Sequence, residues 1–422
     1  MPLEGTEDMM VWKTWSYGAT HQGVTTLYGV GGSPPVRGLV HWGTRSTTVD
    51  YPPLALYELA AVGHVYQALS PTFDNTRWLN VAIKLPGLFA ELALTWFLYA
   101  LARRRYGLAA ARWGATAYWM NPASVLNGAV LGYLDPLMAL PAITSIAVAF
   151  SSPILGGVLI ALACSTKAQA IFLMPVVVLA AWNGSAMKPA AAAMRTSAAA
   201  VIASLVILLP YLVVGAGPNV AQGVSSVLRH DMLSAYAANV WWVFTFFMRA
   251  SYAVVDMGVW AAWTMPMRIL GISTIVRLGY PDPRPFATAA VALAALWGLW
   301  RARHSRDLSL FYALGGFIMH AYFMLGVAVH ENHLYLAVPL LAVAAGARPR
   351  LRPVHIAISA VIALNLFLFF GLGRGIPLPP RTFTIIDATV VLAVANCVVF
   401  AWHALTFNSE CRATEPLPIV EV

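Results

Sequence analysis

Residues 194–215 read MRTSAAAVIASLVILLPYLVVG, with Arg195 as their one charged side chain. A membrane helix needs roughly 20 mostly apolar residues, so this run is long enough to cross a bilayer. Similar runs recur along the chain of 422 residues, which is 59% hydrophobic and only 10% charged. Soluble domains carry about 25% charged residues. The sequence therefore predicts an all-α, polytopic transmembrane helical bundle, and its continuous rather than alternating apolar runs exclude an outer-membrane barrel.

Hydropathy predicts about 13 crossings. They are expected at 82–102, 108–122, 134–150, 153–166, 169–184, 194–215, 240–256, 258–276, 286–302, 308–328, 334–347, 354–372 and 385–407. The chain then divides into a non-cytoplasmic loop at 1–80, a transmembrane domain at 81–407 and a short cytoplasmic tail at 408–422.

Basic residues cluster in four short loops, at 103–105, 188–195, 301–306 and 348–352. The predicted crossings place all four loops on one side, and Lys and Arg favour the cytoplasmic side of a membrane. The net charge of +9 reflects these topology signals rather than a nucleic-acid partner. The remaining loops, including residues 1–80, fall together on the outer side and carry nearly all the unusual polar residues.

Nothing ahead of residues 1–80 accounts for their export to the outer side. We expect a first signal-anchor helix that the sequence lacks, and the alternative is that the helix at 82–102 carries a short loop across by itself. Residues 53–69 follow Pro52-Pro53, a favoured helix start. Their mixture of apolar residues with Glu58, His64 and Gln67 predicts an amphipathic helix on the outer leaflet.

An acidic pair, Glu7-Asp8, lies near the start of this outer loop and is followed by Trp12 and Trp15. A solvated loop charge is the simplest interpretation of such a pair. Two acids at a membrane face, beside aromatic residues, also match the pocket with a titratable group that marks a catalytic site. We predict Asp8 as a general base, with Glu7 secondary.

A second motif, Asp50-Tyr51-Pro52-Pro53-Leu54, precedes the interfacial helix. Asp50 could cap that helix, or Asp50 and Tyr51 could contact a ligand. Both interpretations stay open from the sequence.

The stretch from Asn121-Pro122 to Asp135 breaks a predicted crossing and ends in a carboxylate near membrane depth. A charged residue at the centre of a membrane helix costs roughly 2.5–3.5 kcal/mol, so it usually has a function or a partner. Lys167 and Gln169 sit between two apolar helices on the same side. They are predicted to hold a phosphate, or Lys167 pairs with Asp135.

Further polar candidates lie on the same outer face. Asn239 and Trp241 end the largest internal outer loop, although tryptophans there also suit the membrane interface. His330-Glu331-Asn332-His333 is not the HExxH zinc signature, because its histidines are three apart. Arg374 and Arg381 flank a proline cluster. The guanidinium group of arginine has paired N–H donors that match phosphate oxygens. These residues are expected to contact substrate: Asn239, Trp241, His330, Glu331, His333, Arg374 and Arg381.

The chain resembles the GT-C superfamily of membrane glycosyltransferases, which use polyprenyl-phosphate sugars. The order of motifs is similar: an acidic pair in the first outer loop, Asp-Tyr-Pro-Pro, Asn-Pro with a later Asp, Lys-x-Gln, Asn-x-Trp and His-Glu-x-His. The motifs at 50–54 and 330–334 look like the dolichyl-phosphate-glucose glucosyltransferases of N-glycan assembly. The stretch 121–135 looks more like bacterial mannosyltransferase-type members. Asn332 departs from the Lys that is usual in those glucosyltransferases.

The resemblance implies an inverting transfer of a hexose, mannose or glucose, from a polyprenyl-phosphate carrier to a lipid-linked or other glycan acceptor. A carboxylate must take the proton of the attacking hydroxyl. The phosphate leaves as a stable anion, so one carboxylate suffices, and fixed positive charge and donors must surround it. Asp135 would orient the sugar or the acceptor, and Lys167 with the His330–His333 cluster would hold the phosphate.

No cofactor is required by this scheme, and a divalent metal is not expected, although an acidic pair is able to bind one. The three cysteines are scattered and suggest neither a disulfide framework nor a metal site.

A secondary transporter or flippase is the main alternative function. The chain shows no repeated halves of the kind that transporters have, which counts against this alternative. A non-catalytic scaffold subunit of a membrane complex is the third candidate function. The expected location is a bacterial plasma membrane, with the site on its periplasmic or exterior face.

Overall fold

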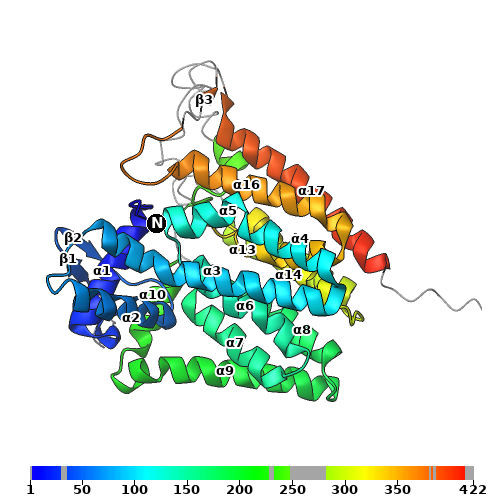
Figure 1. Cartoon of the computed structure of the whole chain (residues 1–422), viewed down its shortest axis with the longest axis horizontal. Coiled ribbons are helices and arrows are strands. Elements are labelled where there is room, and N and C mark those ends of the chain that lie inside the picture. Colours follow the sequence, from blue (N-terminus) through cyan, green and yellow to red (C-terminus); the bar gives the residue numbers. More distant parts are fainter. Residues whose placement is uncertain are drawn as a thin grey trace, which may run out of the picture.

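The computed structural model describes residues 2–29, 36–227, 232–247, 282–379, 382–383 and 386–413. These residues form a bundle of helices with two very short antiparallel hairpins (Figure 1). In the hairpins Val40 pairs with Thr47 and Thr382 with Asp387. The all-α class predicted from the apolar runs is confirmed.

Two groups of elements make up the chain. The first contains α1 (Glu7–Gln22), η1 (Val24–Thr26), β1 (Val40–Trp42), β2 (Arg45–Thr47) and α2 (Pro53–Leu69). The second contains α3 (Arg77–Tyr106), α4 (Leu108–Trp119), α5 (Pro122–Ser124), the π-helix η2 (Val125–Leu131), α6 (Asp135–Ala149), α7 (Pro153–Thr166), η3 (Ala168–Leu173), α8 (Met174–Gly184), α9 (Pro189–Val213), α10 (Gly217–Val227), α13 (Arg284–Ala302), α14 (Leu308–Leu325), α15 (Ala337–Ala347), η6 (Pro349–Leu351), α16 (Arg352–Phe370), β3 (Thr382–Phe383), β4 (Ile386–Asp387) and α17 (Ala388–Ala413). Residues 240–247 are also helical.

Within the described ranges, six helices are long and apolar enough to cross a membrane: Arg77–Tyr106, Pro189–Val213, Arg284–Ala302, Leu308–Leu325, Pro349–Phe370 and Ala388–Ala413. Shorter apolar helices are Asp135–Ala149, Pro153–Thr166, Ala168–Gly184 and Ala337–Ala347. Helices dominate because the bilayer offers no hydrogen bonds, so each backbone group must be paired within its own segment. The chain is a multi-pass membrane protein. The predicted crossing 258–276 and most of 240–256 lie outside the described residues.

Helix α3 connects two opposite ends of the bundle. Near its start, Asn80 and Lys84 donate hydrogen bonds to the carbonyls of Pro2 and Leu3, just ahead of α1. A helix of this length places its other end about 45 Å from its start. At that end, the hydroxyl of Tyr106 donates to the carboxylate of Asp307. We call these the Asp8 end and the Arg348 end. Figure 1 shows α1, α2 and the β1–β2 hairpin gathered at the Asp8 end.

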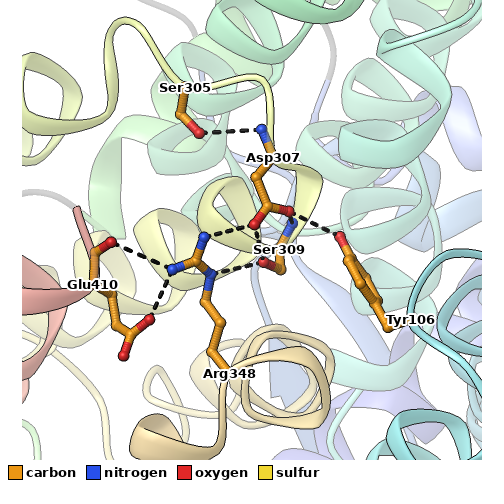
Figure 2. A network of polar contacts seen from close by, with 6 residues as sticks. All are labelled: Tyr106, Ser305, Asp307, Ser309, Arg348 and Glu410. Carbon is orange, nitrogen blue, oxygen red and sulfur yellow. Dashed lines mark hydrogen bonds and ion pairs between the residues drawn. The ribbon is translucent and has the colours of Figure 1, made fainter. Parts of the chain in front are cut away.

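The Arg348 end is held by one buried arginine (Figure 2). Arg348 bonds to Ser309 at 2.7 Å, to Asp307 at 2.6 Å and to Glu410 at 2.7 Å. Asp307 also caps α14 by accepting from the backbone N–H of Ser309. These contacts bring the ends of α3, α14, α15 and α17 together. The basic loops at 103–105, 301–306 and 348–352 therefore lie at the same end of the bundle.

The helix α17 carries polar residues at intervals of seven, about two helical turns. Thr389, Asn396, His403 and Glu410 are all buried. The amide oxygen of Asn396 accepts from His320 Nε2 at 3.0 Å, and the Nδ1 atoms of His403 and His320 lie 3.1 Å apart. Polar contacts of this kind hold membrane helices together. The helix continues to Ala413, so the first residues of the tail predicted at 408–422 are helical, and Glu410 is buried rather than solvated.

The first eighty residues form a packed unit rather than an open loop. The predicted interfacial helix appears with the expected bounds, as α2. A second helix, α1, was not predicted from the sequence. It packs closely on α2, because Gly63 has no side chain at the point where Ser16 and Thr20 approach. Ser16 donates to the carbonyl of Leu59 at 2.8 Å across this contact.

Candidate active site at the Asp8 end

Asp135 is the most heavily bonded carboxylate of the candidate site, and it is fully buried. Its Oδ1 accepts from the ammonium of Lys167 at 2.8 Å and from Gln169 at 3.1 Å. Its Oδ2 accepts from Asn332 at 2.8 Å and from Asn127 at 3.4 Å. The pairing of Lys167 with Asp135, one of two interpretations of the sequence, is present in the structure.

Local chain breaks place these groups together. Asn121 caps α5 by accepting from the backbone N–H of Ala123. The π-helix η2 then ends at Gly132, whose φ of 83° favours glycine. Asp135 follows in the first turn of α6, where the helix dipole favours a negative charge. Lys167 sits at the junction where α7 ends and η3 begins.

Asp8 lies in the first turn of α1 and is half-buried. Burial raises the pKa of its carboxyl to about 6. The positive charge of Lys167 opposes this rise, whereas the negative charges of Asp50, Asp135 and Glu7 add to it. The charges of Lys167 and of three other carboxylates therefore act on Asp8, and its raised pKa lies in the range that suits proton transfer.

Tyr51 feels the charges of several of these acids. Burial raises the pKa of its hydroxyl, and the charges of Asp8, Asp135, Asp50 and Glu331 raise it further, in that order. The charges of these four carboxylates therefore all act on one side chain.

Aromatic and cationic contacts fix the ring of Tyr51. Its centroid is 4.7 Å from that of Trp12 and 5.7 Å from that of Trp15. The ammonium of Lys167 lies 5.9 Å from the ring centroid, within the range of a cation–π contact. The N-cap residue of α2 is Pro52, which makes no side-chain cap. Asp50 lies two residues before this N-cap position.

The His330–His333 cluster lies in the loop between α14 and α15, and Glu331 and His333 are buried there. Tyr133 donates to Glu331 Oε1 at 2.5 Å, and burial raises the pKa of Glu331 to about 7. His333 Nδ1 bonds the hydroxyl of Tyr322 at 2.8 Å. Burial lowers the pKa of His333 well below its ordinary value, and the charges of Lys167 and His330 lower it further. His333 is therefore neutral, and it offers a hydrogen bond rather than a charge.

Glu7 lies at the exposed rim of the site. Its carboxylate pairs with Arg45 of β2 and, at 3.1 Å, with Arg374. The backbone N–H of Arg374 also donates to the carbonyl of Gly5 at 2.8 Å. The structure thus places Glu7 and Arg374 against each other. Arg381 lies outside the described residues.

Two predicted substrate contacts lie against α14. Asn239 donates to the carbonyls of Phe323 and Gly326 at 3.1 and 3.4 Å, and it accepts from the backbone N–H of Trp242. Trp241 donates to the carbonyl of Leu325 at 2.8 Å. Their polar atoms anchor the helix at 240–247 to the end of α14.

Several residues of the site were not predicted. Asn127 and Tyr133 lie inside the stretch 121–135, but only Asp135 was singled out there. Asn332 was noted for its departure from a lysine and not as a partner of Asp135. Tyr322 lies in an apolar helix, where nothing in the sequence distinguishes it. Within the described ranges, no three His, Cys, Asp or Glu side chains converge so as to hold a metal ion.

No protein-family model matches the chain, and no curated protein matches it. Among solved structures, the chain is similar to the oligosaccharyltransferase of Archaeoglobus fulgidus, crystallised with a tethered acceptor peptide that contains an NVT sequon. The TM-score is 0.41 and the identity 13%, over 98% of this chain and 52% of the archaeal one. The chain thus spans about half the length of that protein. A TM-score this low does not establish a common fold.

Proposed function

We propose that the chain is an inverting glycosyltransferase that moves a hexose from a polyprenyl-phosphate carrier to a glycan or glycolipid acceptor. The observation that carries the proposal is the position of Asp8. The charge of Lys167 acts on this half-buried carboxylate, and Lys167 is itself held by the buried carboxylate of Asp135. An ionisable carboxylate and a fixed cation therefore act on each other at one end of the bundle, which supports the assignment of Asp8 as the base.

The reaction uses these two groups in one step. The acceptor hydroxyl oxygen forms a bond to the anomeric carbon of the hexose, while the bond from that carbon to the phosphate oxygen breaks. The electron pair of the broken bond leaves on the phosphate, and Asp8 takes the hydroxyl proton. Attack opposite the leaving group inverts the anomeric centre. The phosphate leaves as a stable anion, so this step needs no second carboxyl acting as an acid, unlike glycoside hydrolysis.

Charge and hydrogen-bond donors for the leaving phosphate come from Lys167 and the neighbouring loop. Lys167 supplies a compact positive charge, which stabilises negative charge that develops on the phosphate. Its charge also acts on Glu331 and His333, so it lies within reach of the α14–α15 loop. The rings of His333 and His330 lie on the same loop with their centroids 5.3 Å apart, and they would supply ring N–H donors.

The test compares two neighbouring acids in the purified full-length chain, supplied with polyprenyl-phosphate mannose or glucose and a glycolipid acceptor. We expect Asp8→Asn to lower transfer at least about 100-fold, the usual contribution of a general base. Glu7→Gln should retain activity within about tenfold, because Glu7 pairs with arginines at the rim. Released polyprenyl phosphate and labelled glycan are both measured.

Undiminished transfer by Asp8→Asn would remove Asp8 as the base. Movement of substrate that depends on a gradient and releases no polyprenyl phosphate would support the alternative of a secondary transporter or flippase.

A further inference from the structure

The carboxylate of Asp135 has no acceptor position left for a substrate. A carboxylate offers about four lone-pair sites. Lys167, Gln169, Asn332 and Asn127 occupy them at 2.8, 3.1, 2.8 and 3.4 Å. Asp135 is also completely buried. A sugar hydroxyl could reach it only by displacing one of these donors.

We infer that Asp135 and Asn332 are positioning residues that hold the Lys167 ammonium beside Asp8, ready for the phosphate of the substrate. This inference rests on the proposed function and assigns Asp135 a different part from the sugar contact expected from the sequence. Lys167 would touch the phosphate, and Asp135 would act through Lys167.

Lys167 needs such a partner because its ammonium is buried. An uncompensated buried charge costs several kcal/mol, so without Asp135 the side chain would turn away or lose its proton. One of its three N–H groups bonds Asp135, and its ammonium also contacts the face of Tyr51. These contacts leave N–H groups of the ammonium to bond an anion.

Asn332 matches this arrangement because its amide is neutral. It donates to Asp135 Oδ2 and leaves Oδ1 to Lys167 and Gln169. A lysine at position 332 would instead bring a second cation to the same carboxylate and would compete with Lys167 for it. Asn332→Lys should therefore weaken the bond between Asp135 and Lys167, although it adds positive charge to the site.

The pH profile distinguishes positioning from a simple charge effect. The charged groups that act on Asp8 are Lys167, Asp50, Asp135 and Glu7, and Glu331 is affected by Asp8 in turn. Lys167 lowers the pKa of Asp8 more than Asp135 raises it. If Asp135→Asn displaces Lys167, the acidic limb of the rate profile moves to higher pH. If Lys167 stays in place, the limb moves to lower pH, because only a negative charge is lost.

The experiment measures binding of farnesyl phosphate and the pH dependence of kcat/KM for transfer, with the full chain in detergent. We expect Asp135→Asn to weaken farnesyl phosphate binding at least about tenfold, which corresponds to 1.4 kcal/mol, and to move the acidic limb to higher pH. Asp74→Asn, which removes an exposed carboxylate from the same end, should change neither. The exchanged pair Asp135→Asn with Asn332→Asp should recover part of the binding, because it returns one carboxylate to the cluster.

Unchanged farnesyl phosphate binding by Asp135→Asn, together with a limb that moves to lower pH, would overturn the inference while leaving the proposed function standing. A wild-type chain that neither binds farnesyl phosphate nor transfers sugar would instead overturn the proposed function, and this inference with it. If Asp135→Asn does not fold, Asn332→Lys provides the same comparison, and unaltered binding by that variant would count against the inference.

Discussion

The hydroxyl of Tyr133 donates a hydrogen bond of 2.5 Å to the carboxylate of Glu331, although the two residues are 198 positions apart. Tyr133 lies between the π-helix η2 and α6, and Glu331 lies between α14 and α15. The bond therefore joins two loops at the Asp8 end. Glu331 is only 3% exposed, so its charge is costly there.

Glu331 should make the protein less stable at high pH. Its folded-state pKa of about 7 lies above its ordinary value of 4.5. The stability that the neutral acid contributes is therefore complete below pH 4.5 and is lost as the pH rises through 7. This rise in the pKa of Glu331 corresponds to about 3 kcal/mol of folding stability lost at high pH. Thermal unfolding in detergent should show Glu331→Gln gaining stability relative to wild type at pH 8 but not at pH 4, and Glu4→Gln, at an exposed position, should show no such gain.

The rate of sugar transfer should depend on the ionisation of Asp8. A carboxyl acts as a base only when it is ionised, and burial raises the pKa of Asp8 to about 6. We expect kcat/KM to rise about tenfold per pH unit below pH 6 and to level off above it. Lys167→Met should move this limb to higher pH, since the charge of Lys167 lowers the pKa of Asp8. A limb that stayed at the same pH in Lys167→Met would argue against direct coupling of these two residues.

The crossing of α1 and α2 should be sensitive to one added methyl group. A Cβ at Gly63 would lie 2.1 Å from Thr20 Oγ1 and 2.8 Å from the carbonyl oxygen of Ser16. Gly63→Ala should therefore push α1 away, costing about 1–3 kcal/mol of stability, and reduce transfer because α1 carries Asp8. Ala61→Leu adds more volume on the exposed side of the same helix and should be tolerated. Full activity in Gly63→Ala would mean that α1 tolerates the displacement.

The network in Figure 2 predicts a large stability effect far from the site. Arg348→Ala leaves Glu410 buried without its cation, and breaking a buried pair costs about 3–5 kcal/mol. Arg348→Lys should recover little of the lost stability. A single ammonium cannot replace the planar guanidinium, which bonds Asp307, Ser309 and Glu410 at the same time. Arg350→Ala removes an exposed arginine two residues away and should shift the unfolding temperature only slightly. Equal losses in both alanine variants would contradict the role given to Arg348.

Much of the bundle was predictable because apolar runs and prolines act locally. The helix at 53–69 was predicted with its exact bounds, since Pro52-Pro53 sets its start. The helix α1 was missed because Glu7–Gln22 contains no long apolar run, and only its contacts with α2 reveal its buried face. The end of α17 was also missed, since Glu410 looks like a solvated tail residue until Arg348 is placed beside it.

The sequence by itself determined that this chain crosses a membrane repeatedly and that the loops between its apolar runs carry unusual polar residues. Long apolar runs have one solution in lipid, because each backbone N–H and C=O must be paired within its own helix. Only the tertiary structure decided which polar groups meet. Asp135 takes its donors from positions 127, 167, 169 and 332, and Glu7 pairs with Arg45 and Arg374. These partners depend on how separate helices pack, and no local pattern of residues encodes that packing.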